Sequence, residues 1–460
     1  MFGCSKRYLR TPIAPWTAGT VVGARSLRAF VADTSVPAYS TDSASGIELE
    51  RASGLDEQGA IEKTNSAIIL DSAQRIQLLC RQLRKDEAVH LTHSTISDHA
   101  LDELRMRIGR EFQGPDPWLT EVTRDAIRHF AWGVGDRNPL WLDPAYASAS
   151  RFGTLIAPPS ILYAFDRVVS GYVGGLPGVH AMFAGSKFQW FRELRLGDRL
   201  VARSKLKDLV EHKSTFSGRA IQQIYEVNFL DERGDRVATV DSWCFRTQRT
   251  EARVRGKYQY MEPQSYTEDE LSRIAEMYAR EEIRGSTPRF WQDAESGDSI
   301  GPIVKGPLTT TSVVAFDQGW GGLYIRAHAY AFDLYRRHPA LALANAAGIP
   351  EPPERVHWDS DLAREVGVPA AYDYGPERVS WLINLLTNWM GDDGSLLSLD
   401  AQVRRFNLLG DTTYIHGRVT RKWIEGDGDR SHRVECSLWA EDQRGEVTAK
   451  ATGVVALPSR

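Results

Sequence analysis

The sequence repeats one pattern twice, and this repetition limits its fold more than any other feature. A Leu-Gly-Asp tripeptide occurs at 196–198 and again at 409–411. Each is followed by alternating apolar residues and then by an acidic turn that ends in glycine, at Gly234 and Gly445. The spacing from the glycine of the tripeptide to the glycine of the turn is 37 residues in one place and 35 in the other. Such similar spacing indicates two copies of one structural unit.

An apolar segment precedes each Leu-Gly-Asp corner, at 158–165 and at 376–386. Each begins at proline and is followed by glycine, near Gly171 and at Gly391, which is typical of the start and end of a helix. We therefore expect a buried helix in each copy. A buried helix followed by antiparallel strands predicts an α+β fold, in which the two sheets pair edge to edge as one continuous sheet.

The repeat predicts how the 460 residues divide into domains. The first structural unit is expected at 97–250 and the second at 301–460. Residues 251–300 are charged and polar, with a helical pattern near 268–284, and are expected to form a linker. Residues 1–96 are expected to be an N-terminal extension, largely irregular.

The N-terminal extension leaves the location of the protein open. Residues 1–32 carry five basic side chains and no acidic one, a composition that suits a mitochondrial transit peptide and hence the mitochondrial matrix. The alternative is an extension without a targeting role, in a cytoplasmic protein. After it, Ser97 or Asp98 is expected to cap a helix that runs to Phe112.

Composition and motifs argue against several classes of partner and cofactor. The net charge of -4 provides no basic footprint for a phosphate backbone, so nucleic acid is not an expected partner. No apolar run approaches the roughly 18 residues that span a membrane. The four cysteines stand singly, without the spacing of metal ligands, and no glycine-rich nucleotide loop occurs. We expect no metal and no cofactor.

The segment 135–143 reads Gly-Asp-Arg-Asn-Pro-Leu-Trp-Leu-Asp. It resembles the motif Gly-Asp-x-Asn-Pro-x-His-x-Asp of the MaoC-like (R)-specific enoyl-thioester hydratases and their fatty-acid-synthase-type dehydratase relatives. The resemblance covers most of residues 97–460 and includes the Leu-Gly-Asp corners. It implies a double hotdog fold, in which each of two fused domains has a long central helix wrapped by an antiparallel sheet.

Each copy of the motif is incomplete. Trp141 stands where the motif has its histidine, and an indole cannot transfer a proton near neutral pH. In the second copy, His357 is 53 residues before Gly410, close to the 56 residues that separate Trp141 from Gly197. His357 therefore occupies the histidine position, although no Asp-x-Asn-Pro precedes it.

The resemblance implies a hydratase or dehydratase that adds water to, or removes it from, an acyl thioester. Asp136, assisted by Asn138, and His357 are the predicted catalytic residues. Because each copy keeps what the other has lost, we predict one composite site across the two copies. The alternative is two separate degenerate pockets. Coenzyme A or acyl carrier protein would carry the acyl group, and association into a homo-oligomer stays open.

Five further residues are predicted to contact substrate: Trp141, His180, Asp373, Tyr374 and Gly375. Asp373 has the alternative role of a helix cap, and His180 that of a structural histidine. Several tryptophans suggest either a bulky acyl group or ordinary core packing.

Two rival functions remain. The incomplete motifs favour a thioester-binding or partner subunit without activity. Hotdog domains also support thioesterases, because a fold does not determine a reaction.

Overall fold

The computed structural model describes residues 96–460, except 115, 177–178, 215–217 and 248–260. Within this described part, ten strands form one sheet in the order β1-β3-β4-β5-β2-β9-β12-β11-β10-β6, and every neighbouring pair is antiparallel. The strands are β1 (Glu111–Phe112), β2 (His180–Trp190), β3 (Val201–Ser214), β4 (Gly218–Leu230), β5 (Arg236–Thr247), β6 (Ser299–Lys305), β9 (Ser395–Val403), β10 (Thr413–Ile424), β11 (His432–Asp442) and β12 (Val447–Ala456).

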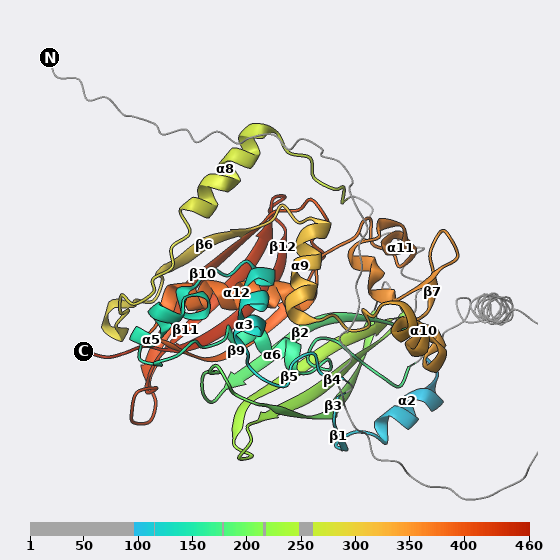
Figure 1. Cartoon of the computed structure of the whole chain (residues 1–460), viewed down its shortest axis with the longest axis horizontal. Coiled ribbons are helices and arrows are strands. Elements are labelled where there is room, and N and C mark those ends of the chain that lie inside the picture. Colours follow the sequence, from blue (N-terminus) through green and yellow to red (C-terminus); the bar gives the residue numbers. More distant parts are fainter. Residues whose placement is uncertain (1–95, 115, 177–178, 215–217, 248–260) are drawn as a thin grey trace, which may run out of the picture. The chain divides into compact units, whose positions relative to one another are not determined.

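The two halves of the sheet have the same topology. Read from the outer edge inward, the first half runs β1-β3-β4-β5-β2 and the second β6-β10-β11-β12-β9, so the strands correspond in chain order. The halves meet where β2 pairs with β9, with Phe188 opposite Leu399. Figure 1 shows the green strands of the first half continuing into the red strands of the second. The predicted α+β double hotdog, with edge-to-edge pairing of its sheets, is confirmed.

The two central helices differ greatly in length. Helix α12 (Gly375–Met390) has 16 residues, and every residue from Pro376 to Met390 is buried. In the first copy, a 3₁₀ turn (Pro159–Ile161) leads into α6 (Leu162–Phe165), which has four residues. The prediction that this helix continues to near Gly171 is wrong. Asp166 leaves the helical conformation, and its side chain accepts hydrogen bonds from the backbone N–H groups of Val168 and Val169.

The remaining elements lie before, within and between the two halves of the sheet in the chain. They are the helices α2 (Asp98–Arg105), α3 (Arg124–Val134), α4 (Pro139–Leu142), α5 (Pro144–Ala149), α8 (Glu268–Ala279), α9 (Thr310–Trp320), α10 (His328–Arg337) and α11 (Ser360–Glu365), the 3₁₀ turns η2 (Trp291–Asp293), η3 (Pro339–Leu341) and η4 (Pro353–His357), and the short strands β7 (Leu343–Ala344) and β8 (Pro350–Glu351).

Helix α8 agrees with the helical pattern predicted in the linker. Ser97 caps α2 as predicted, through the N–H of Ala100, but the helix ends at Arg105. Glu111 and Phe112 belong instead to the edge strand β1.

The predictions for residues 1–95 lie outside the described residues. Over the part of the chain that is described, every helix is too short or too polar to cross a bilayer.

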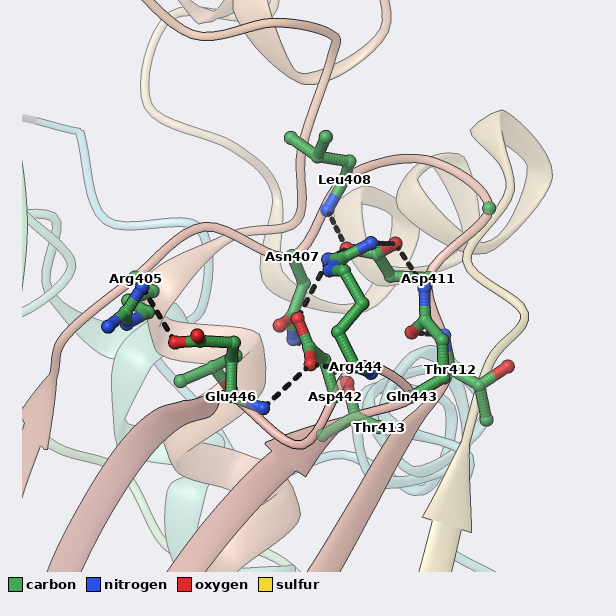
Figure 2. A network of polar contacts seen from close by, with 12 residues as sticks. Arg405, Asn407, Leu408, Asp411, Thr412, Thr413, Asp442, Gln443, Arg444 and Glu446 are labelled. Atoms are coloured by element: carbon green, nitrogen blue, oxygen red, sulfur yellow. Dashed lines mark hydrogen bonds and ion pairs between the residues drawn. The ribbon is translucent and has the colours of Figure 1, made fainter. Parts of the chain in front are cut away.

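Both Leu-Gly-Asp corners lead into a strand, as predicted. Gly197 and Gly410 have φ values of +91° and +94°, a conformation that glycine adopts without strain. Figure 2 shows the second corner, where the Asp411 carboxylate accepts hydrogen bonds from the Leu408 N–H at 2.8 Å and from the Gln443 and Arg444 side chains. The corner is thus joined to the turn between β11 and β12, which explains why the two features keep a similar spacing in both copies.

Candidate functional site

The Gly-Asp-x-Asn-Pro segment forms the turn between α3 and α4. Gly135 ends α3 in the left-handed conformation. The Asp136 carboxylate accepts the N–H of Asn138 at 3.0 Å, and the Asn138 side chain caps α4 through the N–H of Leu140 at 3.0 Å. Asp143 in turn caps α5. The polar residues of the motif therefore fix the course of the chain, and they bury Asp136 and Asn138, which are 3% and 2% exposed.

The environment of the Asp136 carboxyl group raises its pKa toward neutral pH. Burial raises its pKa to about 6, against the opposing charge of Lys305 and the hydrogen bond from Asn138. The indole N–H of Trp141 also lowers this pKa, although its geometry falls short of a hydrogen bond. A carboxyl group with such a pKa can both accept and donate a proton at physiological pH.

The groups around Asp136 come from beyond the first domain. Lys305, the last residue of β6 in the second copy, donates a hydrogen bond from its Nζ to the carbonyl oxygen of Gly135 at 2.7 Å. Glu281, which follows α8, accepts hydrogen bonds from Arg137 at 3.1 Å and from the Asn388 side chain of α12 at 3.0 Å. The motif of the first copy therefore faces the central helix and edge strand of the second.

A small cavity adjoins the motif. It has a volume of about 30 Å³ and is lined by Asn138, Trp141 and Trp190 from the first copy and by the end of α12, including Thr387 and Met390. Such a volume accommodates water, whereas ligand pockets usually measure ~300–1,000 Å³. Trp141 and Trp190 are buried here, so the cavity admits an acyl chain only if side chains move.

His357 lies in the second copy at the position that corresponds to Trp141. Asp359 caps α11 just as Asp143 caps α5, which supports this alignment. The Nδ1 atom of His357 lies 2.8 Å from the carbonyl oxygen of Tyr372, which can only accept a hydrogen bond, so Nδ1 carries the proton and Nε2 a lone pair. Burial of the ring lowers its pKa to about 4, although the residue as a whole is half-buried. The imidazole is thus a neutral group that can accept a proton.

Two carboxyl groups that interact with Tyr374, beside His357, were not among the predicted site residues: Glu354 is buried and Asp317 is half-buried. Glu354 accepts the N–H groups of Leu323 and Tyr324, each at 2.8 Å, and the Tyr374 hydroxyl at 3.3 Å. Asp317, on α9, has its pKa raised to about 8 by burial and by the charge of Glu354, against a hydrogen bond with Tyr374. The spacing from Glu354 to His357 equals that from Asn138 to Trp141, so the sequence contained a signal for Glu354. It contained none for Asp317, because only the fold brings α9 to this place.

The other predicted contacts have varied surroundings. Asp373 forms an ion pair with buried Arg378, with 2.8 Å between Nε and Oδ2. No side chain caps α12, so the alternative that Asp373 is a cap is wrong. A Cβ atom on Gly375 would lie 2.2 Å from the Phe183 ring, so glycine permits a close contact with β2. His180 is the first residue of β2, and its side chain lies outside the described residues.

Asp136 and His357 have different neighbours. Within the part of the chain that the structure describes, no hydrogen bond, ion pair or ring contact joins the two. Asp136 lies near Lys305, whereas the His357 ring lies 3.8 Å from the ring of Tyr374, centroid to centroid. The composite site across the two copies therefore stays a prediction.

Comparison with known proteins places this geometry in a family. Residues 106–240 match the model of the FAS1-like dehydratase domain region. A UPF0336 protein of Streptomyces avermitilis is 34% identical over 137 residues, which cover 29% of this chain and 87% of that relative. A probable enoyl-CoA hydratase alpha subunit of Thermomonospora curvata is 29% identical over 166 residues, covering 31% of this chain and half of the relative.

A solved structure of a MaoC-like dehydratase has the same fold as most of this chain. The two superpose with a TM-score of 0.52 at 19% identity, over 77% of this chain and 99% of the other. These matches agree with the repeated hotdog topology and the motif at residues 135–143: the chain belongs to one family with the UPF0336 proteins, and it has the fold of the MaoC-like dehydratases.

Proposed function

We propose that this protein catalyses the reversible addition of water to an α,β-unsaturated acyl thioester. One observation carries the proposal: the Asp136 carboxyl group is buried at the contact between the two hotdog domains, within a hydratase-like motif, and burial raises its pKa to about 6. The sequence likeness to a probable enoyl-CoA hydratase subunit supports the same reaction. Either coenzyme A or acyl carrier protein would suit as the carrier.

Asp136 is the proposed base that takes a proton from water as the oxygen bonds to the β-carbon. Asn138 holds the loop through its cap on α4. His357 is a second proposed base, either within the same site or in a pocket of its own. Among the predicted substrate contacts, Trp141 and Tyr374 lie beside these two groups and stay in the proposal.

The test measures hydration of enoyl-CoA substrates, from short-chain to aromatic and sterol-sized, by the full chain and by single variants. We expect Asp136→Asn to lower kcat/KM by ~10²- to 10⁴-fold, the usual contribution of a positioned base. Asp166→Asn is the matched control, because the pKa of this buried carboxyl is also raised to about 6 but the residue lies outside the motif. Wild-type kcat/KM should fall below about pH 6 as Asp136 becomes protonated. Equal activity of wild type and Asp136→Asn would show that this carboxyl group takes no part in the mechanism. The variant His357→Ala tests the imidazole in the same way.

A second candidate function is thioester binding without turnover. The indole at the motif histidine position favours it, because an indole does not transfer protons near neutral pH. Acyl-CoA titration with no loss of the enoyl group would support this candidate, and release of free thiol would indicate a thioesterase instead. Trp141→His is an informative variant, because it opens the cavity and restores an imidazole.

A further inference from the structure

The motif of the first copy lacks its imidazole, but it does not lack a second proton-carrying group. Lys305 is 5% exposed, and its Nζ lies against the turn that contains Asp136. A Cβ atom built on Gly135 would meet the Nζ at 3.6 Å. The amine therefore packs directly on the residue that precedes Asp136.

The Lys305 amine uses only part of its hydrogen-bonding capacity for contacts with the described residues. An ammonium group has three N–H donors, and one of them goes to the Gly135 carbonyl oxygen. Among the described residues, no other hydrogen bond and no ion pair within 4.0 Å involves this Nζ. Donors thus remain for a ligand bound beside the Asp136 carboxylate.

Four charged groups act on Lys305 from the elements packed around it. Burial lowers the pKa of the amine, and the charges of Glu281, Asp136 and Glu377 oppose this effect, whereas Arg137 adds to it. These groups come from the linker, the motif loop and α12. The charges of the amine and of the Asp136 carboxyl group thus act on each other's pKa.

We propose that Lys305 is the proton-transferring partner of Asp136, in the role that the motif histidine would otherwise have. This inference rests on the proposed hydration reaction. It assigns the second half of the acid/base pair to β6 of the second hotdog domain, and it makes the site of the first copy complete without His357.

The proposed proton transfers return both Asp136 and Lys305 to their starting protonation states. The Asp136 carboxylate accepts a proton from water as the hydroxyl oxygen bonds to the β-carbon, and the π electrons move into the thioester enolate. The Lys305 ammonium donates a proton to the α-carbon as the enolate collapses. The carboxyl proton then returns to the amine, which restores both groups and leaves a 3-hydroxyacyl thioester.

The test compares Lys305→Met, Lys305→Arg and the double variant Lys305→Met/Trp141→His with wild type. We expect Lys305→Met to lower kcat/KM by ~10²- to 10⁴-fold. Lys305→Arg should be nearly as inactive, because a guanidinium keeps the positive charge but does not release a proton near neutral pH. The double variant should recover activity, since it places an imidazole at the motif position. Lys422→Met is the control, because this half-buried lysine of β10 pairs with Glu295 outside the motif.

The pH profile separates proton transfer from a purely structural role. Wild-type kcat/KM should fall at high pH as the amine loses its proton, and Lys305→Arg should lose this alkaline limb. Full activity in Lys305→Met or in Lys305→Arg would overturn the inference while leaving the hydratase proposal intact. If wild type itself hydrates no enoyl thioester, the proposed function fails first. Folding of each variant is checked by denaturant unfolding, and Lys305→Arg decides the question if Lys305→Met is unfolded.

Discussion

The two hotdog domains have the same corners, turns and strand order, but their central segments differ. The same backbone hydrogen bond fixes the start of each central segment, from Ala157 N–H to the Leu194 carbonyl oxygen and from Asp373 N–H to the Asn407 carbonyl oxygen. By this alignment, Asp373 corresponds to Ala157 and Arg378 to Leu162. The second copy thus has a buried ion pair where the first has two apolar residues.

The difference continues along the helix. The first central segment ends its helix at Phe165, whereas α12 runs on to Met390. Corners, turns and strand order are nevertheless the same in both halves. The sheet, corners and turns of a hotdog domain therefore tolerate large changes in the central helix. These changes decide which polar groups lie in each site.

The largest expected effect comes from removing the cation that only the second domain has. Arg378→Met leaves the buried Asp373 carboxylate without its ion-pair partner, and this should lower the free energy of unfolding by about 3–5 kcal/mol. Leu162→Met, at the corresponding position of the first domain, should cost less than about 1.5 kcal/mol. Urea unfolding measures both.

The double variant Asp373→Ala/Arg378→Leu copies the apolar pair of the first domain. Because it removes both charges, it should recover most of the stability that Arg378→Met loses. A cost of under about 1 kcal/mol for Arg378→Met would mean that the ion pair does not stabilise the start of α12.

The next effect concerns Asp317, which corresponds to Ala131 in the first domain. Helices α3 and α9 pack symmetrically, because Gly133 lies against Ala315 and Phe316 just as Gly319 lies against His129 and Phe130. The pKa of this carboxyl group is about 8 in the folded protein and near 3.8 when exposed. The folded state therefore holds a proton that the unfolded chain has lost. The free energy of unfolding should fall as the pH rises from about 4 to 8, by at most about 1.4 kcal/mol per pH unit from this group.

Asp317→Asn removes this titration, so its stability should fall less steeply over the same range and exceed that of wild type at pH 8. Unfolding experiments at several pH values measure the slope. The control is Asp125→Asn, at a largely exposed carboxyl group of α3, which should keep the wild-type slope. Parallel curves for wild type and Asp317→Asn would contradict the prediction.

The smallest expected effect is a difference in stability between variants of two equivalent turns, at Asp442 and at Asp231. Asp442 accepts the N–H groups of Arg444 and Glu446, just as Asp231 accepts those of Arg233 and Asp235. The Asp442 side chain is 1% exposed and also belongs to the network in Figure 2. Asp442→Ala should cost about 1–3 kcal/mol, because it leaves partly buried N–H donors without acceptors.

Asp231→Ala should cost less, because the side chain is 10% exposed and its turn is open to water. Chemical unfolding of the two variants side by side tests the ranking. A larger loss in Asp231→Ala than in Asp442→Ala would show that the two turns are not equivalent.

The corners, turns and strand faces could largely be predicted from the sequence, because each depends on residues that are close together in the chain. The glycines of the Leu-Gly-Asp corners supply positive φ, the acidic turns bind their own backbone, and apolar alternation fixes which face of β4 and β11 is buried. The short α6 was not predicted, because Asp166 ends the helix through hydrogen bonds that the apolar residues before it do not reveal.

The candidate site divides in the same way. The motif at 135–143 identified Asp136 and Asn138, and the spacing to the corner identified His357. Lys305 and Asp317 lie on β6 and α9, far from these motifs in the sequence. Neither has a signal of its own in the sequence.

By itself, the amino-acid sequence determined the repeat, the turns and the identity of the motif residues, because backbone conformation and capping depend on near neighbours in the chain. Only the tertiary structure decided what surrounds each motif. It set the Lys305 amine beside Asp136 and the Tyr374 ring beside His357. Contacts between distant segments arise from packing and desolvation in the assembled core, and these also set the protonation of the buried groups.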